Sequence, residues 1–176
     1  ISLNGRWLFR PGYEVQRGED PADPHRSDAG WHVMDVPHFW NPVRNWLHLQ
    51  ESGLPHGGSG VSDNYREQEE QRCDSYTFDH RRTTDAWYRQ WIVLPQETAG
   101  KRLVVHFDAV AMAAEVSVNG VRAGGNVGMF GSFDVDLTEH VRPGKNLLAV
   151  HVMAAEPDGS AEARRQVARA VSVDIT

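Results

Sequence analysis

The 176-residue sequence has one cysteine, Cys73, and no run that approaches the roughly 20 apolar residues needed for a membrane-spanning helix. A single cysteine cannot form an intramolecular disulfide or a cysteine-based zinc site. Positive charge is also scarce, because 18 Lys and Arg oppose 24 Asp and Glu, giving a formal net charge of −6. The sequence therefore has no excess of positive charge that would attract nucleic acid or an anionic membrane, and we expect neither as a partner.

The ends of the sequence lack the usual marks of a complete chain. The segment Ile1-Ser2-Leu3-Asn4-Gly5 has neither the basic nor the apolar region of a signal peptide. There is no initiating Met, and Asp174-Ile175-Thr176 falls within strand-like alternation. We therefore interpret the sequence as a soluble piece of a longer polypeptide. A cytoplasmic location and a periplasmic or secreted one after signal removal both stay open.

Strand-like alternation is the main pattern that is present. Apolar residues make up 40% of the chain, enough to bury a core. Period-two alternation predicts strands near 3–9, 31–36, 86–94, 103–107, 114–118, 133–137, 147–153 and 171–175. Either 171–175 closes the sheet or the closing strand lies beyond Thr176. Asn119-Gly120 predicts a two-residue hairpin turn. Together these features predict an all-β fold, an antiparallel β-sandwich of jelly-roll type. Residues 160–169 instead favour a helix.

Two connections interrupt this pattern. Residues 18–30 are rich in Asp, Pro and Gly, which is typical of a solvated connection. Residues 44–85 form a stretch of about 40 residues without strand periodicity, longer than an ordinary loop. We interpret it as a loop followed by a short exposed helix, with Ser62-Asp63 as the N-terminal cap and the polar run extending to Arg72. The chain is then a single domain, 1–176, that carries an insertion at 44–85.

Several pieces of sequence, taken in order, resemble the N-terminal sugar-binding domain of glycoside hydrolase family 2, which includes β-galactosidases and β-glucuronidases. They are Asn4-Gly5-Arg6-Trp7-Leu8-Phe9, Val36-Pro37-His38-Phe39-Trp40, Trp87-Tyr88-Arg89, Val118-Asn119-Gly120 and Pro143-Gly144-Lys145-Asn146-Leu147. The long insertion departs from the family pattern, and Gly124-Gly125-Asn126-Val127 replaces the usual Val-Gly-x-His.

The resemblance implies a galactose-binding-like jelly roll placed before an immunoglobulin-like domain and a (β/α)₈ barrel that performs retaining hydrolysis. The expected partners are then downstream domains of the same polypeptide and a carbohydrate. A homo-oligomer of the parent enzyme is left open.

The catalytic acid/base motif of that family is missing from this sequence. In the family the acid/base Glu follows an Asn, and none of the seven Asn here precedes Glu. We expect the chain alone to be inactive, with no catalytic residue, cofactor or metal site. Asp134 and Asp136 are interpreted as the solvated side of a strand. The nine His residues are interpreted as scattered surface residues, and the glycines from Gly124 to Gly131 as a flexible loop.

Two residues are candidates for substrate binding. Asp158-Gly159-Ser160 resembles a β-galactosidase segment whose Asp reaches the barrel's site, although any Asp-Gly pair also forms a plain turn. Trp46, in the insertion, offers an indole that could stack on a pyranose, or it could pack the insertion onto the sandwich.

The remaining aromatic and charged candidates have structural interpretations. Most of the five other Trp residues should fill the core. Arg89 should be buried in an ion pair with Asp108 or Glu115.

Three functional hypotheses follow. The first is a non-catalytic N-terminal domain of a family 2 glycoside hydrolase that packs on the catalytic barrel and contributes to its substrate site. The second is a free-standing carbohydrate-binding module or lectin-like domain, and the third is an interaction scaffold without sugar affinity.

Overall fold

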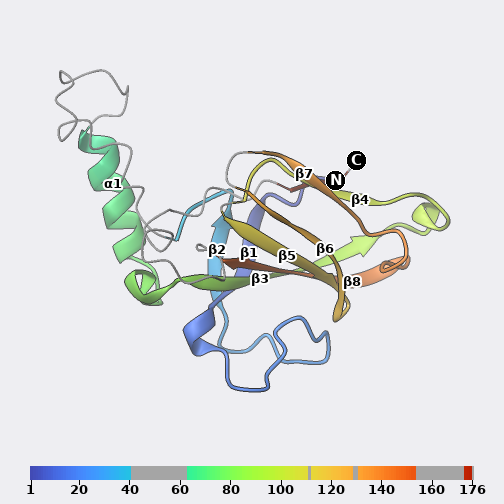
Figure 1. Cartoon of the computed structure of the whole chain (residues 1–176), viewed down its shortest axis with the longest axis horizontal. Coiled ribbons are helices and arrows are strands. Elements are labelled where there is room, and N and C mark those ends of the chain that lie inside the picture. Colours follow the sequence, from blue (N-terminus) through green and yellow to red (C-terminus); the bar gives the residue numbers. More distant parts are fainter. Residues whose placement is uncertain (41–62, 111, 129–130, 154–172, 176) are drawn as a thin grey trace.

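Two antiparallel sheets pack against each other in the computed structural model, which describes residues 1–40, 63–110, 112–128, 131–153 and 173–175 (Figure 1). The six-stranded sheet has the order β2 (His32–Val36), β1 (Gly5–Pro11), β3 (Asp85–Leu94), β8 (Gly144–Met153), β5 (Ala113–Val118) and β6 (Val121–Val127). The three-stranded sheet has the order β7 (Phe133–Asp136), β4 (Val104–Phe107) and β9 (Val173–Ile175). The predicted all-β antiparallel sandwich is confirmed.

The core lies between the two sheets and follows the alternation of the sequence. Phe9 of β1 packs edge-on against Tyr88 of β3, with ring centroids 5.0 Å apart. The three-stranded sheet contributes Phe107 and Val135 to the same cluster. On β7 the neighbouring Asp134 is exposed, as predicted. The inward faces of β1, β3, β4 and β7 therefore supply apolar surface whose removal from water drives folding.

The hairpin between β5 and β6 has the predicted turn. Asn119 adopts φ +52° and Gly120 adopts φ +84°. Two successive left-handed residues match the type I′ geometry that Asn-Gly favours, because Gly pays no Cβ penalty there and Asn tolerates it.

Gly124 and Gly125 lie in strand β6, so the predicted flexible loop is wrong at these two positions. A Cβ on Gly124 would stand 2.8 Å from Cγ1 of Val135, and one on Gly125 would stand 2.3 Å from the carbonyl oxygen of Ala114. The glycines let β6 approach β7 and β5 more closely than larger residues allow.

Helix α1 (Asp63–Asp74) confirms the predicted exposed helix and projects away from the sandwich in Figure 1. The end of the helix and the residues after it return to the core, where Cys73 and Phe78 are buried and the tilted rings of Phe78 and Phe9 have centroids 4.5 Å apart. The C-terminal part of the predicted insertion is thus packed into the domain. Short 3₁₀ turns occupy Gly12–Glu14, His80–Arg82 and Gln96–Thr98.

Strand β9 pairs with β4, so the last predicted strand is confirmed over Val173–Ile175. The helix expected at 160–169 lies outside the described residues.

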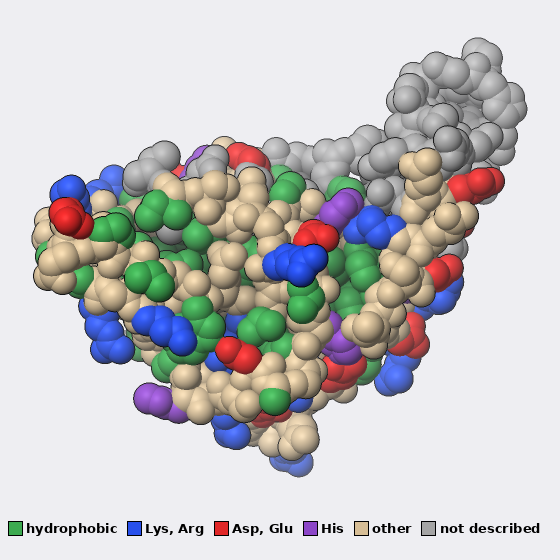
Figure 2. Space-filling view, turned by 180° about the vertical axis from the view of Figure 1, so that it is seen from behind, with side chains coloured by type: hydrophobic (Ala, Val, Ile, Leu, Met, Phe, Trp, Pro, Cys, Tyr) green, Lys and Arg blue, Asp and Glu red, His purple; other side chains and the backbone are tan. Residues whose placement is uncertain are grey.

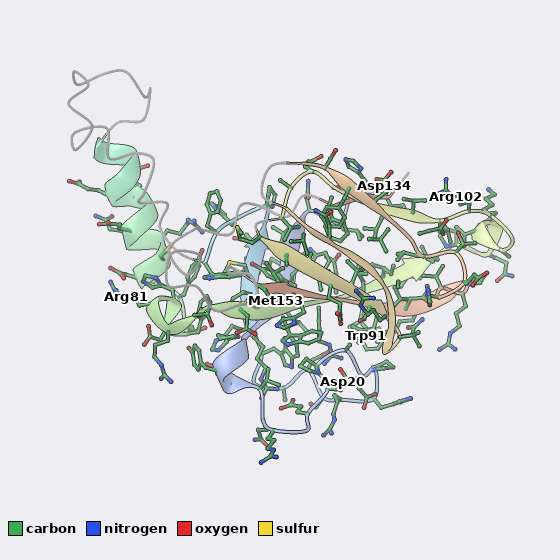
Figure 3. All side chains as sticks on the ribbon, in the orientation of Figure 1. Asp20, Arg81, Trp91, Arg102, Asp134 and Met153 are labelled. Atoms are coloured by element: carbon green, nitrogen blue, oxygen red, sulfur yellow. The ribbon has the colours of Figure 1, made fainter. Side chains whose placement is uncertain are left out.

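The connection between β1 and β2 is more than a solvated loop, contrary to prediction. Pro21 and Ala22 are buried, and Pro24 lies within van der Waals reach of the position that a Cβ on Gly120 would occupy. Residues 15–31, here called the covering loop, therefore pack on the outer face of the six-stranded sheet. Figure 3 shows Asp20 of this loop below the sheet, on the side where Trp91 lies.

Candidate functional site

The start of β3 organises one end of the sandwich, which we call the insertion end. Nε1 of Trp40 donates a hydrogen bond to the carbonyl oxygen of Thr83 at 3.2 Å. Met153, the last residue of β8, pairs with Asp85. Trp40 and Met153 are the described residues that precede 41–62 and 154–172. The sequence candidates Trp46 and Asp158 fall in those two ranges and lie outside the described residues.

An Asp–His–Trp cluster stands on β3 and β8 at this end. Nε2 of His151 lies 2.8 Å from Oδ2 of Asp85, and the His151 ring stacks on Trp87 with centroids 4.4 Å apart and planes 3° apart. The hydrogen bond from His151 holds the pKa of Asp85 below its usual value, against the opposing effect of burial. A Cβ on Gly12 would meet the Asp85 carboxylate at 2.1 Å, so Gly12 makes room for it.

A second His–carboxylate pair joins α1 to the start of β3. Nε2 of the buried His80 lies 2.9 Å from Oδ1 of Asp74, and Arg81 donates to the same oxygen at 2.6 Å. The hydrogen bond with His80 is the main cause of a lowered pKa at Asp74. The backbone N–H of Arg81 donates to Asp79, which caps the 3₁₀ turn. These contacts fix the end of the helix against the sandwich.

A third pair involves His32 at the start of β2. Its Nε2 lies 3.0 Å from Oε2 of Glu14, and its Nδ1 lies 2.7 Å from Oγ1 of Thr77. The expectation of scattered surface histidines is therefore wrong for His32, His80 and His151, and also for His106, since each has a defined carboxylate partner. Within the described part of the chain no group of three or more His, Cys, Asp or Glu is placed to hold a metal ion.

Arg89 is fully buried in an ion pair, as expected, but its partner is different. Its Nη2 lies 3.2 Å from Oδ1 of Asp28, in the covering loop, and its guanidinium lies over the Trp31 ring at 5.0 Å. The other carboxylate oxygen of Asp28 accepts a hydrogen bond from Nε1 of Trp91 at 2.9 Å. Asp28 thus clamps the covering loop to β3.

The two carboxylates predicted to pair with Arg89 have other partners. Glu115 pairs with Arg122 at 2.9 Å, and Asp108 lies 3.4 Å from His106.

The tryptophans divide between core and outer face. Trp7 and Trp40 are buried, as predicted for most of the five strand-associated Trp. Trp31, Trp87 and Trp91 are only half-buried, because they stand on or beside the outer face of the six-stranded sheet. With two of the five in the core, the prediction that most of them fill it is wrong, since alternation alone does not say which face of a strand is covered.

The described surface carries charges of both signs side by side. Blue and red side chains are interspersed over the face seen in Figure 2. Such a surface offers little attraction to a polyanion. Of the described helices, none has the length and apolar character needed to cross a bilayer.

The model of one protein family matches residues 60–173, and its description is "Glycosyl hydrolase 2 galactose-binding domain-like". The chain belongs to this family. The match begins inside 44–85, so residues 60–85 are within the range that the family model covers.

Curated relatives are much longer than this domain. A β-glucuronidase of Formosa agariphila is 32% identical over 152 residues, which are 86% of the domain and 13% of that protein. The β-galactosidase BoGH2A of Bacteroides ovatus is 30% identical over 159 residues, which are 90% of the domain and 16% of that protein. The domain therefore spans about a seventh of the length of these relatives.

Solved structures share the fold. A Bifidobacterium dentium β-glucuronidase in complex with coumarin-3-O-glucuronide has a TM-score of 0.59 at 25% identity, covering 88% of the domain and 20% of that chain. A glycosyl hydrolase family 2 member from Bacteroides cellulosilyticus has a TM-score of 0.62 at 22% identity, covering all of the domain and 20% of that chain.

Proposed function

We propose that this chain is a non-catalytic N-terminal domain of a longer family 2 glycosidase. It packs on the catalytic barrel of the same polypeptide and contributes to the substrate site. The observation that carries the proposal is the family match over 60–173, together with the small share of each relative that the domain spans. The relatives are named β-glucuronidases and β-galactosidases, so the parent reaction is retaining hydrolysis of an O-glycosyl bond.

The insertion end is the part of the domain that faces the barrel in this proposal. Two features support it. Trp40 and Met153 lie next to Thr83 and Asp85, and they precede the two ranges that hold the sequence candidates. The three His–carboxylate pairs also fasten this end, and a substrate contact needs a rigid support. Asp158 and Trp46 then supply a hydrogen-bond acceptor and a stacking surface for the sugar.

The test compares variants of the full-length polypeptide. Asp158→Asn and Trp46→Ala should raise KM by about tenfold, because a lost hydrogen bond or stacking contact to substrate costs about 1.5 kcal/mol. Asp35→Asn, on the exposed side of β2, is the matched control and should leave KM unchanged. Wild-type kinetics in both test variants would refute the contribution to the substrate site.

A second measurement tests the non-catalytic assignment. The 176-residue chain should release no product from p-nitrophenyl β-galactoside or β-glucuronide, because the acid/base motif of the family is missing from its sequence. Turnover that survives purification to homogeneity would refute the assignment.

A free-standing carbohydrate-binding module is the second candidate, and a polar hollow at the opposite end of the sandwich favours it. The two candidates differ in the reading frame after Thr176. A continuation of several hundred residues with an Asn-Glu motif supports the glycosidase, and a stop codon supports the module.

A further inference from the structure

A polar hollow of about 380 Å³ lies at the end of the sandwich away from α1. It is lined by Arg102, Asp136, Thr138, Glu139 and His140, and we call it the distal hollow. Figure 3 shows Arg102 at the opposite end of the domain from Arg81, which lies beside the base of α1. The volume falls within the range of about 300–1,000 Å³ that is usual for small-molecule sites.

Asp136 is the anchor of the hollow. Its Oδ1 accepts hydrogen bonds from the backbone N–H of Thr138 at 3.0 Å and from the Thr138 hydroxyl at 2.5 Å. Its Oδ2 accepts from Nε of Arg102 at 2.9 Å. These donors lower the pKa of Asp136 to about 2, so its carboxylate is ionised at neutral pH. Arg102 is therefore held in place through Nε alone.

Hydrogen bonds to Leu137 and Asn119 fix the backbone of the turn that carries His140. The backbone N–H of His140 donates to the carbonyl oxygen of Leu137 at 2.8 Å. The carbonyl oxygen of His140 accepts from Nδ2 of Asn119 at 3.0 Å. Thr138 is tied to the neighbouring chain as well, because its hydroxyl accepts from the backbone N–H of Leu103 at 3.0 Å. The walls of the hollow thus stand on a fixed backbone.

Three groups in the hollow keep their hydrogen-bonding capacity. Within the described residues no hydrogen bond engages the Nη nitrogens of Arg102, the carboxylate of Glu139 or the ring of His140. The guanidinium only donates, the carboxylate only accepts, and the imidazole does either. This set matches a ligand whose groups both donate and accept, which is the property of a sugar hydroxyl.

We propose that the distal hollow binds one neutral saccharide residue through its hydroxyl groups. The charge of the site argues against an anionic sugar. Asp136 already balances Arg102 at 2.9 Å, so the additional acidic side chain of Glu139 gives the hollow more acidic than basic groups. Because the hollow is open and has no aromatic wall, the affinity should be in the millimolar range. The site belongs to this domain itself and does not depend on the proposed function.

The test is an NMR titration of the ¹⁵N-labelled 176-residue chain. Methyl β-D-galactopyranoside and methyl β-D-glucopyranoside are the neutral probes, and glucuronate is the anionic one. At least one neutral probe should give saturable shifts at the amides of Arg102, Thr138 and Glu139, and glucuronate should bind more weakly. No saturable shift with either neutral probe, or tighter binding of glucuronate, would overturn the proposal.

Variants assign the shifts to the hollow. Glu139→Gln breaks no hydrogen bond within the described residues, so it should fold normally and weaken binding about fivefold or more. Arg102→Met removes the exposed pair with Asp136 and both Nη donors, and it should also weaken binding about fivefold or more. Glu97→Gln, an exposed change on the nearby 3₁₀ turn and outside the hollow, should bind as the parent does. Unchanged affinity in Glu139→Gln and Arg102→Met would place the sugar elsewhere and refute the site.

The titration is separate from the kinetics of the full-length polypeptide. Asp158→Asn and Trp46→Ala should leave the binding curve of the distal hollow unchanged. The titration can therefore refute the distal hollow, and the kinetics can refute the proposed function, independently of each other.

Discussion

The side-chain amide of Asn119 donates a hydrogen bond to Oδ1 of Asn146 across 2.9 Å. Asn119 lies in the β5–β6 turn, and Asn146 is fully buried near the start of β8. Asn146 also accepts from the backbone N–H of Arg142 at 3.1 Å and donates to its carbonyl oxygen at 2.6 Å. Oδ1 of Asn119 accepts from the backbone N–H of Leu147 at 3.0 Å. The two asparagine side chains thus join the β5–β6 turn, the residues from His140 to Arg142 and the start of β8.

Replacing Asn146 with Ala should destabilise the domain by about 2–4 kcal/mol, because it removes the hydrogen bonds that the fully buried Asn146 side chain makes with Asn119 and with the backbone of Arg142. Urea unfolding of the chain measures this loss. Asn4→Ala, an exposed change at the other end of the sequence, should cost less than about 0.5 kcal/mol. Equal stability of the two variants would contradict the structural role of the network.

Replacing Asp28 with Ala should cost about 3 kcal/mol, since it removes the carboxylate that pairs directly with the buried guanidinium of Arg89. Trp91 also loses its acceptor, so its fluorescence should change in the folded state. Chemical denaturation followed by fluorescence reports both effects. Asp35→Ala removes an exposed carboxylate and serves as the control. A loss no larger than that of the control would show that Asp28 does not hold the covering loop.

His106 should give the domain a pH-dependent increment of stability. Its Nδ1 lies 2.6 Å from Oδ1 of Asp134 and its Nε2 lies 3.4 Å from Asp108. The hydrogen bond to Asp134 is the main cause of a raised pKa at His106. The stabilisation is then fully present below the unfolded pKa, about 6.5, and is lost as the pH rises through the folded value.

The check compares the free energy of unfolding of His106→Gln and the parent across pH. The difference should be largest near pH 5.5 and should disappear by about pH 9. His25→Gln, in the exposed part of the covering loop, should show no such window. If the difference in unfolding free energy between His106→Gln and the parent grew with rising pH, the raised pKa of His106 would be contradicted.

Gly125→Ala should destabilise the domain by about 1–3 kcal/mol, because the new Cβ would meet the backbone carbonyl of Ala114 at 2.3 Å. Gly131→Ala is a matched control, since a Cβ there has no atom within 4 Å. Thermal melts of both variants measure the effect. Similar melting temperatures would mean that β6 does not need this close approach.

Local patterns were enough to predict most of the strands. The alternation of Phe133, Val135 and Leu137 with Asp134 and Asp136 places one face in the core, and the structure buries Val135 and Leu137. Asn119-Gly120 predicted its own turn, because its left-handed geometry is set by those two residues alone.

Contacts between distant residues were harder to predict. Asp28 and Arg89 are 61 positions apart, and nothing in the local sequence marks Asp28 as the partner. The Asp and Pro content of residues 18–30 predicts a solvated connection, and it carries no sign that the segment packs on the sheet. Gly is depleted in strands, so Gly124 and Gly125 predict a loop, yet here the close approach of Val135 and Ala114 requires glycine within a strand.

The site residues were only partly within reach of the sequence. Trp46 and Asp158 came from the resemblance and from their residue types, and both stay predictions. The distal hollow was missed, since Arg102 and Asp136 become neighbours only when β4 and β7 pair. The Asp136-x-Thr138 spacing is the local signal that could have found its anchor.

The strand order of the larger sheet has a consequence for synthesis of the protein on the ribosome. Strand β8 is paired with β3 on one side and with β5 on the other. Residues 85–94 and 113–118 therefore cannot complete their strand pairing until residues 144–153 have been synthesised. Closing such long loops is slow. A nascent chain released before Met153 would expose the apolar faces of β3 and β5, which makes it a natural target for chaperones. Folding of this domain is therefore decided late in its own translation.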